Sequence, residues 1–239
     1  MEPNATVEAL LEELVGHVSD APQGSSDLAF RRLLNAILSL DLKPGSMLSE
    51  RELMELADCS RAALRPAVIR LGELGLLRAL PRKGLVVAPL DGFDASTIYE
   101  ARGAIEGPVA RLAAARARDE DVERLAALAD HHVGEAMEPD WRSFLQHDLE
   151  LHLAIGKMAG NPYLLDALAR ILPLASRLWH WVYQQLADTE HVRFEHGDIV
   201  TAIRERDPDA AEEAAAEHVR RARTMLNEVL VTRIKDGAR

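Results

Sequence analysis

Hydrophobic residues recur every three to four positions over most of the chain, which is the spacing of helices with one buried face. The pattern predicts a short amphipathic helix over residues 5–18, a linker over residues 21–26 and a longer helix over residues 28–40. From residue 94 onward only helical periodicity is found. It predicts six helices, over residues 94–116, 119–137, 140–159, 161–187, 189–205 and 207–235. The C-terminal part is therefore expected to be an all-α antiparallel bundle.

The stretch from residue 44 to residue 89 has a different order of elements. Ser49, with a glutamate three positions later, has the pattern of a capping box that begins a helix. Ser60 can cap the next helix, and residues 76–88 contain two β-compatible runs that predict a hairpin. Helix, turn, helix and basic hairpin suit the DNA major groove, because the second helix can present side chains to base edges while the hairpin contacts phosphate.

Composition and charge divide the chain into the same parts. At 239 residues there is room for a small domain and a medium one. Residues 27–90 hold ten basic and seven acidic side chains, so they carry +3, and the rest of the chain must carry −14 to give the total of −11. We expect an N-terminal extension and linker (1–26), a winged helix-turn-helix (27–90) and an acidic effector-binding and dimerisation domain (94–235).

Basic side chains fall at the positions of this module that would face DNA. Arg61 and Arg65 are four residues apart and share one helix face, and Arg51 lies near the start of the preceding helix. Minor-groove contacts are predicted at the hairpin tip from Arg82, Lys83 and Gly84. Each arginine taken alone could be an ordinary solvated charge, but five basic positions together on the reading helix and hairpin favour DNA contact.

The segments PGSMLSERELMELADCSR, LGELGLL and PRKGLVVAP carry a resemblance. Over residues 27–88 the chain resembles the winged helix-turn-helix of the GntR family of bacterial regulators. The resemblance implies DNA contacts from Arg51, Ser60, Arg61, Arg65, Lys83 and Gly84. Family members usually have an acidic residue where this chain has Pro66, and a proline inside the reading helix is expected to bend it. The operator of a relative should therefore not be transferred to this chain.

Four residues of the C-terminal part suggest a metal site. Asp148 and His152 are four residues apart on an apolar helix face, and His196 and His218 align with apolar residues on later helices. A carboxylate and three imidazoles that face one core suit a divalent transition metal such as zinc or nickel. The alternative is that each is a hydrogen-bonded core residue. No role is assigned to the other histidines, which are expected to be surface or filler residues: His17, His131, His132, His147, His180 and His191.

A second resemblance bears on the same residues. The segments YEARGAIEGPVARLAA, DLELHLAIGKMAGNP, EHGDIVTAI and AEHVRRA, within residues 94–232, resemble the FCD effector-binding domain of the FadR branch of the GntR family. In that family an Asp-x-x-x-His pair and two later histidines hold a metal, which implies this role for Asp148, His152, His196 and His218. Six helices suggest the VanR-like subgroup. Arg102 matches an arginine that holds an effector carboxylate, although a salt bridge at the surface or an interface is an alternative.

Other local features of the sequence predict details of the fold. Asn161 is expected to cap the helix that begins at Pro162. Pro173 should kink or divide the fourth helix of the bundle. The aromatic residues Trp179 and Tyr183, with Trp181, are expected to pack rather than to line a pocket.

The sequence thus predicts a homodimeric, metal-containing transcription regulator that is not an enzyme. We expect it to be a repressor that leaves a palindromic double-stranded operator when a small organic acid binds. One cysteine, Cys59, and no apolar run of about 20 residues predict a bacterial cytoplasmic protein, on the nucleoid when DNA-bound, without a membrane partner. Two alternatives stay open: a metal-dependent hydrolase-like enzyme that uses the Asp/His centre, and a regulator whose metal-free site is purely structural.

Overall fold

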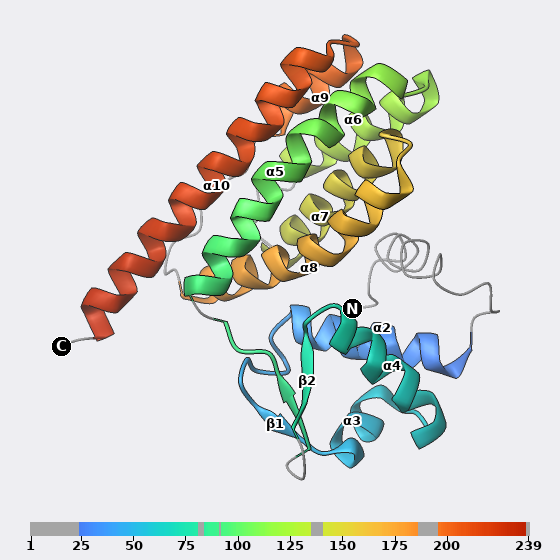
Figure 1. Ribbon diagram of the computed structural model, residues 1–239, viewed down its shortest axis with the longest axis vertical. Coiled ribbons are helices and arrows are strands. Elements are labelled where there is room, and N and C mark those ends of the chain that lie inside the picture. The colour runs from blue at the N-terminus through green and yellow to red at the C-terminus, as the bar shows by residue number, and fades with distance from the viewer. Residues whose placement is uncertain (1–23, 81–83, 91, 135–140, 186–195, 238–239) are drawn as a thin grey trace.

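The computed structural model describes residues 24–80, 84–90, 92–134, 141–185 and 196–237. Among these residues, a small N-terminal unit of three helices and a three-stranded sheet lies at one end of a long helical bundle (Figure 1). Within the described residues no helix has the length and hydropathy to cross a membrane. The expected mainly α fold, a winged helix-turn-helix followed by an all-α bundle, is confirmed.

The elements of the N-terminal unit follow the predicted order, with one additional strand. They are α2 (Ser25–Leu38), β1 (Met47–Leu48), α3 (Glu50–Ala57), α4 (Arg61–Glu73), β2 (Leu77–Leu80) and β3 (Gly84–Val87). The capping box is present, because Ser49 Oγ accepts from the Glu52 amide and the Glu52 carboxylate accepts from the Ser49 amide. Ser60 caps α4 as predicted. Strand β1 was not foreseen, since two residues are too few to show a periodicity.

The core of this unit is built by α2 packing on α4. The fully buried side chains include Phe30, Leu34 and Leu71. Arg70 of α4 fixes the crossing of the two helices, since its guanidinium lies 4.0 Å above the Phe30 ring and 2.6 Å from Asp27. The exposed face of α4 is therefore held at a fixed angle to the rest of the unit.

The small sheet has the order β1-β3-β2, with both pairs antiparallel. Gly84 opens β3 with a φ of +98°, and a Cβ at this position would lie 2.8 Å from the carbonyl oxygen of Leu48. Both the backbone conformation and the close approach of β1 require glycine here.

Six helices make up the bundle in the described part of the chain. They are α5 (Gly92–Arg116), α6 (Asp119–Gly134), α7 (Trp141–Met158), α8 (Pro162–Gln185), α9 (Gly197–Arg204) and α10 (Pro208–Gly237). Asn161 caps α8 as predicted, since its Oδ1 accepts from the amides of Tyr163 and Leu164. Pro173 does not divide α8, which is unbroken from Pro162 to Gln185. Its neighbours are buried on several sides, so packing keeps the helix continuous.

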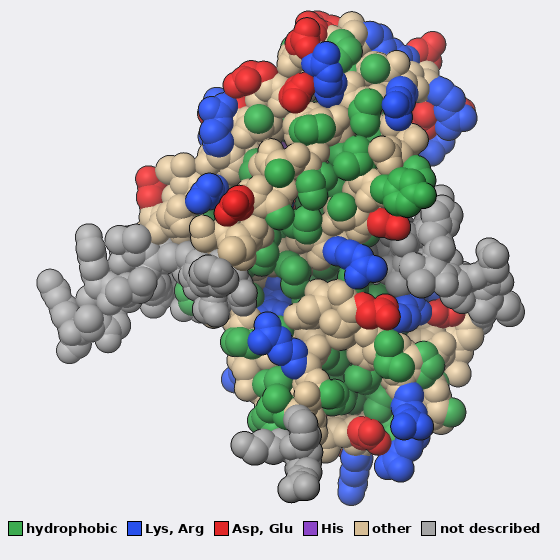
Figure 2. All heavy atoms as spheres, in the orientation of Figure 1, with side chains coloured by type: hydrophobic (Ala, Val, Ile, Leu, Met, Phe, Trp, Pro, Cys, Tyr) green, Lys and Arg blue, Asp and Glu red, His purple; other side chains and the backbone are tan. Residues whose placement is uncertain are grey.

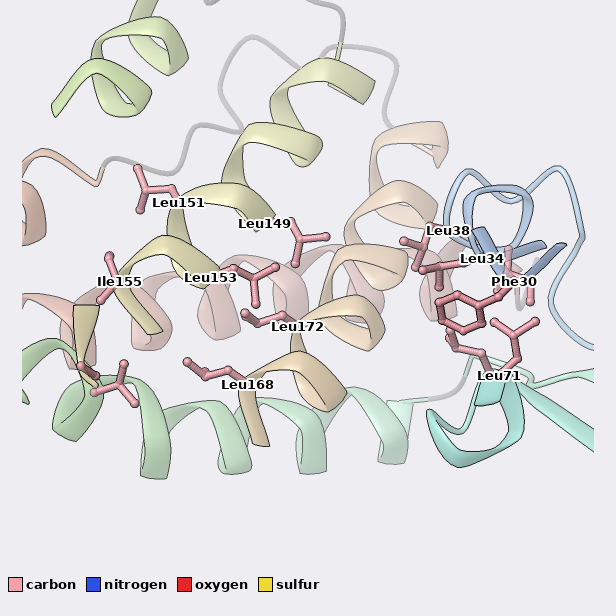
Figure 3. Close-up of a cluster of buried hydrophobic side chains, with 14 of the residues drawn as sticks. Phe30, Leu34, Leu38, Leu71, Leu149, Leu151, Leu153, Ile155, Leu168 and Leu172 are labelled. Atoms are coloured by element: carbon pink, nitrogen blue, oxygen red, sulfur yellow. The ribbon is translucent and has the colours of Figure 1, made fainter. Parts of the chain in front are cut away.

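Helix α8 joins the two units. The hydrophobic cluster drawn in Figure 3 runs from α7 and α8 to α2, with Leu172 on one side and Leu38 on the other. Arg177 of α8 is buried, and its Nη2 donates to the carbonyl oxygens of Ala88 and Pro89, directly after β3. The bundle therefore contacts the segment that leaves the wing.

Candidate functional site

Two helices and the N-cap of a third bring the predicted metal ligands together. Asp148 and His152 project from one face of α7, His218 comes from α10, and His196 occupies the N-cap position of α9. One ligand atom from each of the four lies within 4.8 Å of the others, and the three histidines are buried. His196 was expected inside a helix over residues 189–205. Instead the helix begins at Gly197, and residues 189–195 lie outside the described residues.

The spacing of these atoms fits a metal ion. His196 Nε2 lies 3.2 Å from His152 Nε2 and 3.2 Å from Asp148 Oδ1, and His152 Nε2 lies 3.7 Å from the same oxygen. The ring centroid of His218 is 4.4 Å from that of His196. Donor atoms bound to one tetrahedral zinc ion lie roughly 3.3–3.6 Å apart. Nitrogen and carboxylate donors at these separations therefore form a suitable set for a first-row divalent metal.

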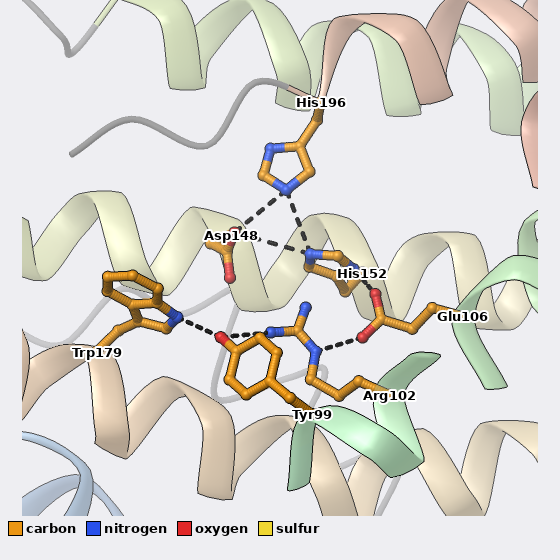
Figure 4. Close-up of polar contacts among 7 residues, drawn as sticks. All are labelled: Tyr99, Arg102, Glu106, Asp148, His152, Trp179 and His196. Carbon is orange, nitrogen blue, oxygen red and sulfur yellow. Dashed lines mark hydrogen bonds and ion pairs between the residues drawn. The ribbon is translucent and has the colours of Figure 1, made fainter. Parts of the chain in front are cut away.

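Glu106 on α5 orients one of the predicted ligands, His152. Its carboxylate lies 2.8 Å from His152 Nδ1, so Nδ1–H donates to it and Nε2 faces the cluster with its lone pair (Figure 4). The other carboxylate oxygen accepts from Arg102 Nε. Glu106 was not among the residues predicted from the sequence, although its place four residues after Arg102 on an apolar face was a usable signal.

The protonation states favour metal binding. Burial lowers the pKa of His196 and holds that of His218 well below its ordinary value, so both imidazoles stay neutral near pH 7. Burial alone would raise the pKa of Asp148, but His152 and a hydrogen bond from His196 outweigh it and keep the pKa below the usual range. The neutral imidazoles of His196 and His218, beside the ionised carboxylate of Asp148, are in the state that binds a cation.

Arg102 lies directly beside this cluster and is 3 % exposed. Its Nε donates to Glu106 and its Nη1 to the hydroxyl of Tyr99, whereas its Nη2 is buried without a hydrogen-bond partner among the described residues. In Figure 4 that third nitrogen points toward the side where Asp148 and His152 lie. An unmatched buried N–H of a guanidinium is costly, so this site is suited to an anion.

Two hollows that are lined by described residues adjoin the cluster. A groove of about 980 Å³ runs along α9 and α10 and is lined partly by His218, so it reaches the cluster from the outside. A void of about 10 Å³ lies beside Glu106 and His152 and has room for no more than about one water molecule. Among the described residues, the groove is thus the larger space open to a small molecule.

The aromatic residues of α8 pack, as predicted. Trp179 and Tyr183 are buried in a second hydrophobic cluster with Tyr99 of α5. Trp179 also donates its indole N–H to the Tyr99 hydroxyl, which ties α8 to the residue that Arg102 contacts. The Trp179 side chain therefore belongs both to the hydrophobic core and to the polar network around Arg102.

Two of the histidines that were given no role are buried. His180 is held by a 3.0 Å contact of its Nδ1 with the carbonyl oxygen of Ser176, and His147 is 6 % exposed. Both are therefore filler rather than surface residues, because these parts of α8 and α7 are enclosed by neighbouring elements, which a one-face pattern does not reveal. The remaining four (His17, His131, His132 and His191) lie outside the described residues or have no described side chain.

The predicted DNA-reading side chains lie on exposed surfaces of α3 and α4. Arg51 and Arg61 are 84 % and 71 % exposed and pair with Glu55 and Glu50 respectively. Arg65 is exposed, with no hydrogen-bond or ion-pair partner in the part of the chain that the structure describes. Basic side chains protrude at the end of this unit that faces away from the bundle (Figure 2).

The remaining predicted contacts concern the cap of α4 and the wing. Ser60 Oγ accepts from the Ala63 amide in the cap, and its hydroxyl hydrogen is still able to donate to a phosphate. Arg82 and Lys83 lie outside the described residues. Gly84 is exposed at the start of β3, beside the hairpin tip.

A winged helix-turn-helix on an all-α body with a buried acid–imidazole cluster defines a class of DNA-binding transcription regulators. Comparison with known families agrees. Residues 26–87 match the model described as bacterial regulatory proteins, gntR family, and residues 97–221 match the FCD domain. The chain belongs to the GntR family and has an FCD domain, and it is accordingly a transcription regulator and not an enzyme.

Relatives and solved structures support this assignment. The chain is 26 % identical to the HTH-type transcriptional repressor RspR of Escherichia coli K12, over 80 % of this chain and 83 % of that protein. It is 29 % identical to the HTH-type transcriptional repressor NanR of Klebsiella aerogenes, over 74 % and 75 % of the two chains. The structure of E. coli McbR/YncC aligns with a TM-score of 0.76 at 20 % identity, over 87 % of this chain and 99 % of that one, and shows the shared fold.

Proposed function

We propose that this regulator is a homodimeric repressor that releases a palindromic operator when a small organic acid binds beside a metal ion. The proposal rests on one observation: a cluster of metal-type ligand atoms and an unpartnered arginine N–H lie together in one buried place. Four metal-type ligand atoms lie within 4.8 Å of one another, and Arg102 beside them has a buried N–H without a partner. A carboxylate can satisfy both kinds of group at once.

In this proposal Asp148, His152, His196 and His218 would hold zinc or nickel, and Glu106 would keep His152 in the binding tautomer. The bound ion would supply a positive centre for one carboxylate oxygen of the effector. Arg102 Nη2 would donate to the other oxygen, and the groove lined by His218 would admit the acid. Assignment to the VanR-like subgroup stays a prediction.

Helix α8 is the proposed route from the effector to DNA. Its Trp179 is bonded to Tyr99, which also accepts from Arg102, while its Arg177 holds the carbonyl oxygens after β3. Arg170, further along the same helix, donates to the carbonyl oxygen of Glu73 at the end of α4, at 3.3 Å. An acid that draws Arg102 toward itself would disturb these contacts and bias the placement of the DNA-reading units.

On the DNA side, the proposed contacts are Arg51, Ser60, Arg61 and Arg65 in the major groove and on phosphates, with Arg82, Lys83 and Gly84 at the wing. The repressor role is supported by RspR and NanR, which carry that description. Two reading units are needed for a palindromic site, so we propose a homodimer. Because its binding partner is operator DNA, we propose that the protein acts in the bacterial cytoplasm and lies on the nucleoid when it is bound to DNA.

The test begins with metal analysis of the purified protein, followed by a thermal-shift screen over small organic acids, including sugar acids. An acid that raises the melting temperature should release operator DNA in fluorescence anisotropy. Arg102→Lys should abolish the response but keep the metal, whereas Arg111→Lys, on the same helix and paired with Asp209 and Glu212, should respond normally.

A regulator with a metal-free structural site is the rival that this experiment separates. Absence of bound metal, together with an unchanged acid response in Asp148→Ala and His196→Ala, would favour that rival. The proposed route through α8 has its own readout. Arg177→Lys should still bind the acid, seen as a normal thermal shift, but should release DNA less well.

A further inference from the structure

The outward face of α4 combines two arginines with an apolar stripe. Its exposed residues between the start of the helix and its third turn are Arg61, Ala62, Arg65, Pro66 and Ile69. Ala62, Pro66 and Ile69 are spaced by four and three residues, so their side chains form one apolar stripe along the helix. A second stripe, formed by Arg61 and Arg65, runs beside it. Ile69 is 61 % exposed, and α4 itself has no acidic residue from Arg61 to Ile69, although Glu50 of α3 pairs with Arg61.

Packing among the described residues does not account for this stripe. The buried side of α4 is made by other residues: Ala63, Leu64, Ala67 and Leu71. Pro66 cannot donate the helical hydrogen bond to the carbonyl oxygen of Ala62, yet α4 runs unbroken from Arg61 to Glu73. The bend expected from Pro66 therefore does not interrupt the helix. Its ring is exposed on the outer face and lies outside the core formed by the described residues.

Thymine offers the matching chemistry. In the major groove the C5-methyl of thymine is the apolar group among the base edges, and apolar side chains recognise it, whereas arginine pairs with guanine. The first turns of a recognition helix are the ones that reach the bases. Ala62 lies in the first turn and Pro66 in the second, each next to an arginine of the parallel stripe.

We infer that Ala62 and Pro66 are specificity-determining residues that read thymine methyl groups beside the positions contacted by Arg61 and Arg65. Each half-site then contains thymine at a fixed offset from the arginine-contacted bases. Ile69 extends the apolar surface toward the wall of the groove. Binding of a second protein to the stripe is the competing explanation, and it predicts no dependence on the methyl group.

The test uses the full-length protein without any effector, so it does not depend on the proposed ligand response. Sites are selected from a random duplex library, and each selected thymine is then replaced by uracil, which removes only the methyl group. Binding is measured by fluorescence anisotropy. The wild type should bind the uracil site about fourfold more weakly per contacted methyl, the loss that one buried CH₂-sized group accounts for.

Two variants complete the design. Pro66→Asn removes the apolar contact and restores a helical N–H, so α4 should stay folded, and its preference for thymine over uracil should disappear at the position it contacts. Leu28→Asn, at an apolar residue of α2 that is 45 % exposed, is the matched control and should keep the full preference. Equal binding of the thymine and uracil sites by the wild type would overturn the inference, as would an undiminished methyl preference in Pro66→Asn.

Discussion

Replacing Glu106 by Gln should weaken metal binding without touching any ligand. The carboxylate accepts from His152 Nδ1 at 2.8 Å with one oxygen and from Arg102 Nε with the other, and both partners are at least 95 % buried. Glutamine has one acceptor oxygen, so one of the two donors must face an NH₂ group. The substitution also removes the charge that balances Arg102.

The expected losses of metal affinity and of stability follow from these contacts. Losing the acceptor that orients a metal-binding histidine costs about 10- to 100-fold in metal affinity. Removing one partner of a buried ion pair should also lower the free energy of unfolding by roughly 3–5 kcal/mol, because Arg102 is left as an unbalanced charge. Metal affinity is measured by competition with a chromophoric chelator, and stability by urea denaturation.

A matched control distinguishes the loss of the Glu106 contacts from a general effect of replacing a glutamate on α5. Glu100 lies on the same helix and is exposed, so Glu100→Gln should leave both quantities unchanged. If Glu106→Gln binds metal within about threefold of the wild type, then His152 does not depend on Glu106 for its orientation and the reasoning fails.

Three further predictions follow from the described geometry. Ser49→Ala removes the cap of α3 and should cost about 0.5–2 kcal/mol of stability; an unchanged urea midpoint would contradict it. Gly84→Ala places a Cβ 2.8 Å from the Leu48 carbonyl oxygen at positive φ and should cost about 1–3 kcal/mol, with weaker DNA binding. Burial lowers the pKa of His196 and His218 below the ordinary 6.5, so the unfolded chain takes up more protons than the folded one as the pH falls below that value. The metal-free protein should therefore lose stability from about pH 6.5 downward, and equal urea midpoints at pH 7.5 and 5.5 would refute this.

Local signals in the sequence determined a large part of the fold. The caps at Ser49, Ser60 and Asn161 depend on residues within three positions, and each is present. Helical periodicity placed the bundle, since one buried face leaves a pattern in the chain. The ligand set Asp148, His152, His196 and His218 could be named in advance, by position on apolar faces and by family resemblance, and the fold brings all four together.

Contacts between distant segments were decided only by the tertiary structure. Glu106 and His152 belong to different helices, so no spacing in the sequence could show that one orients the other. The burial of His180 and the junction of Arg177 with the segment after β3 likewise depend on how α8 is enclosed by its neighbours. Periodicity records whether a residue has a buried side, but hydrogen bonds and ion pairs across the core are set by which helices pack against each other.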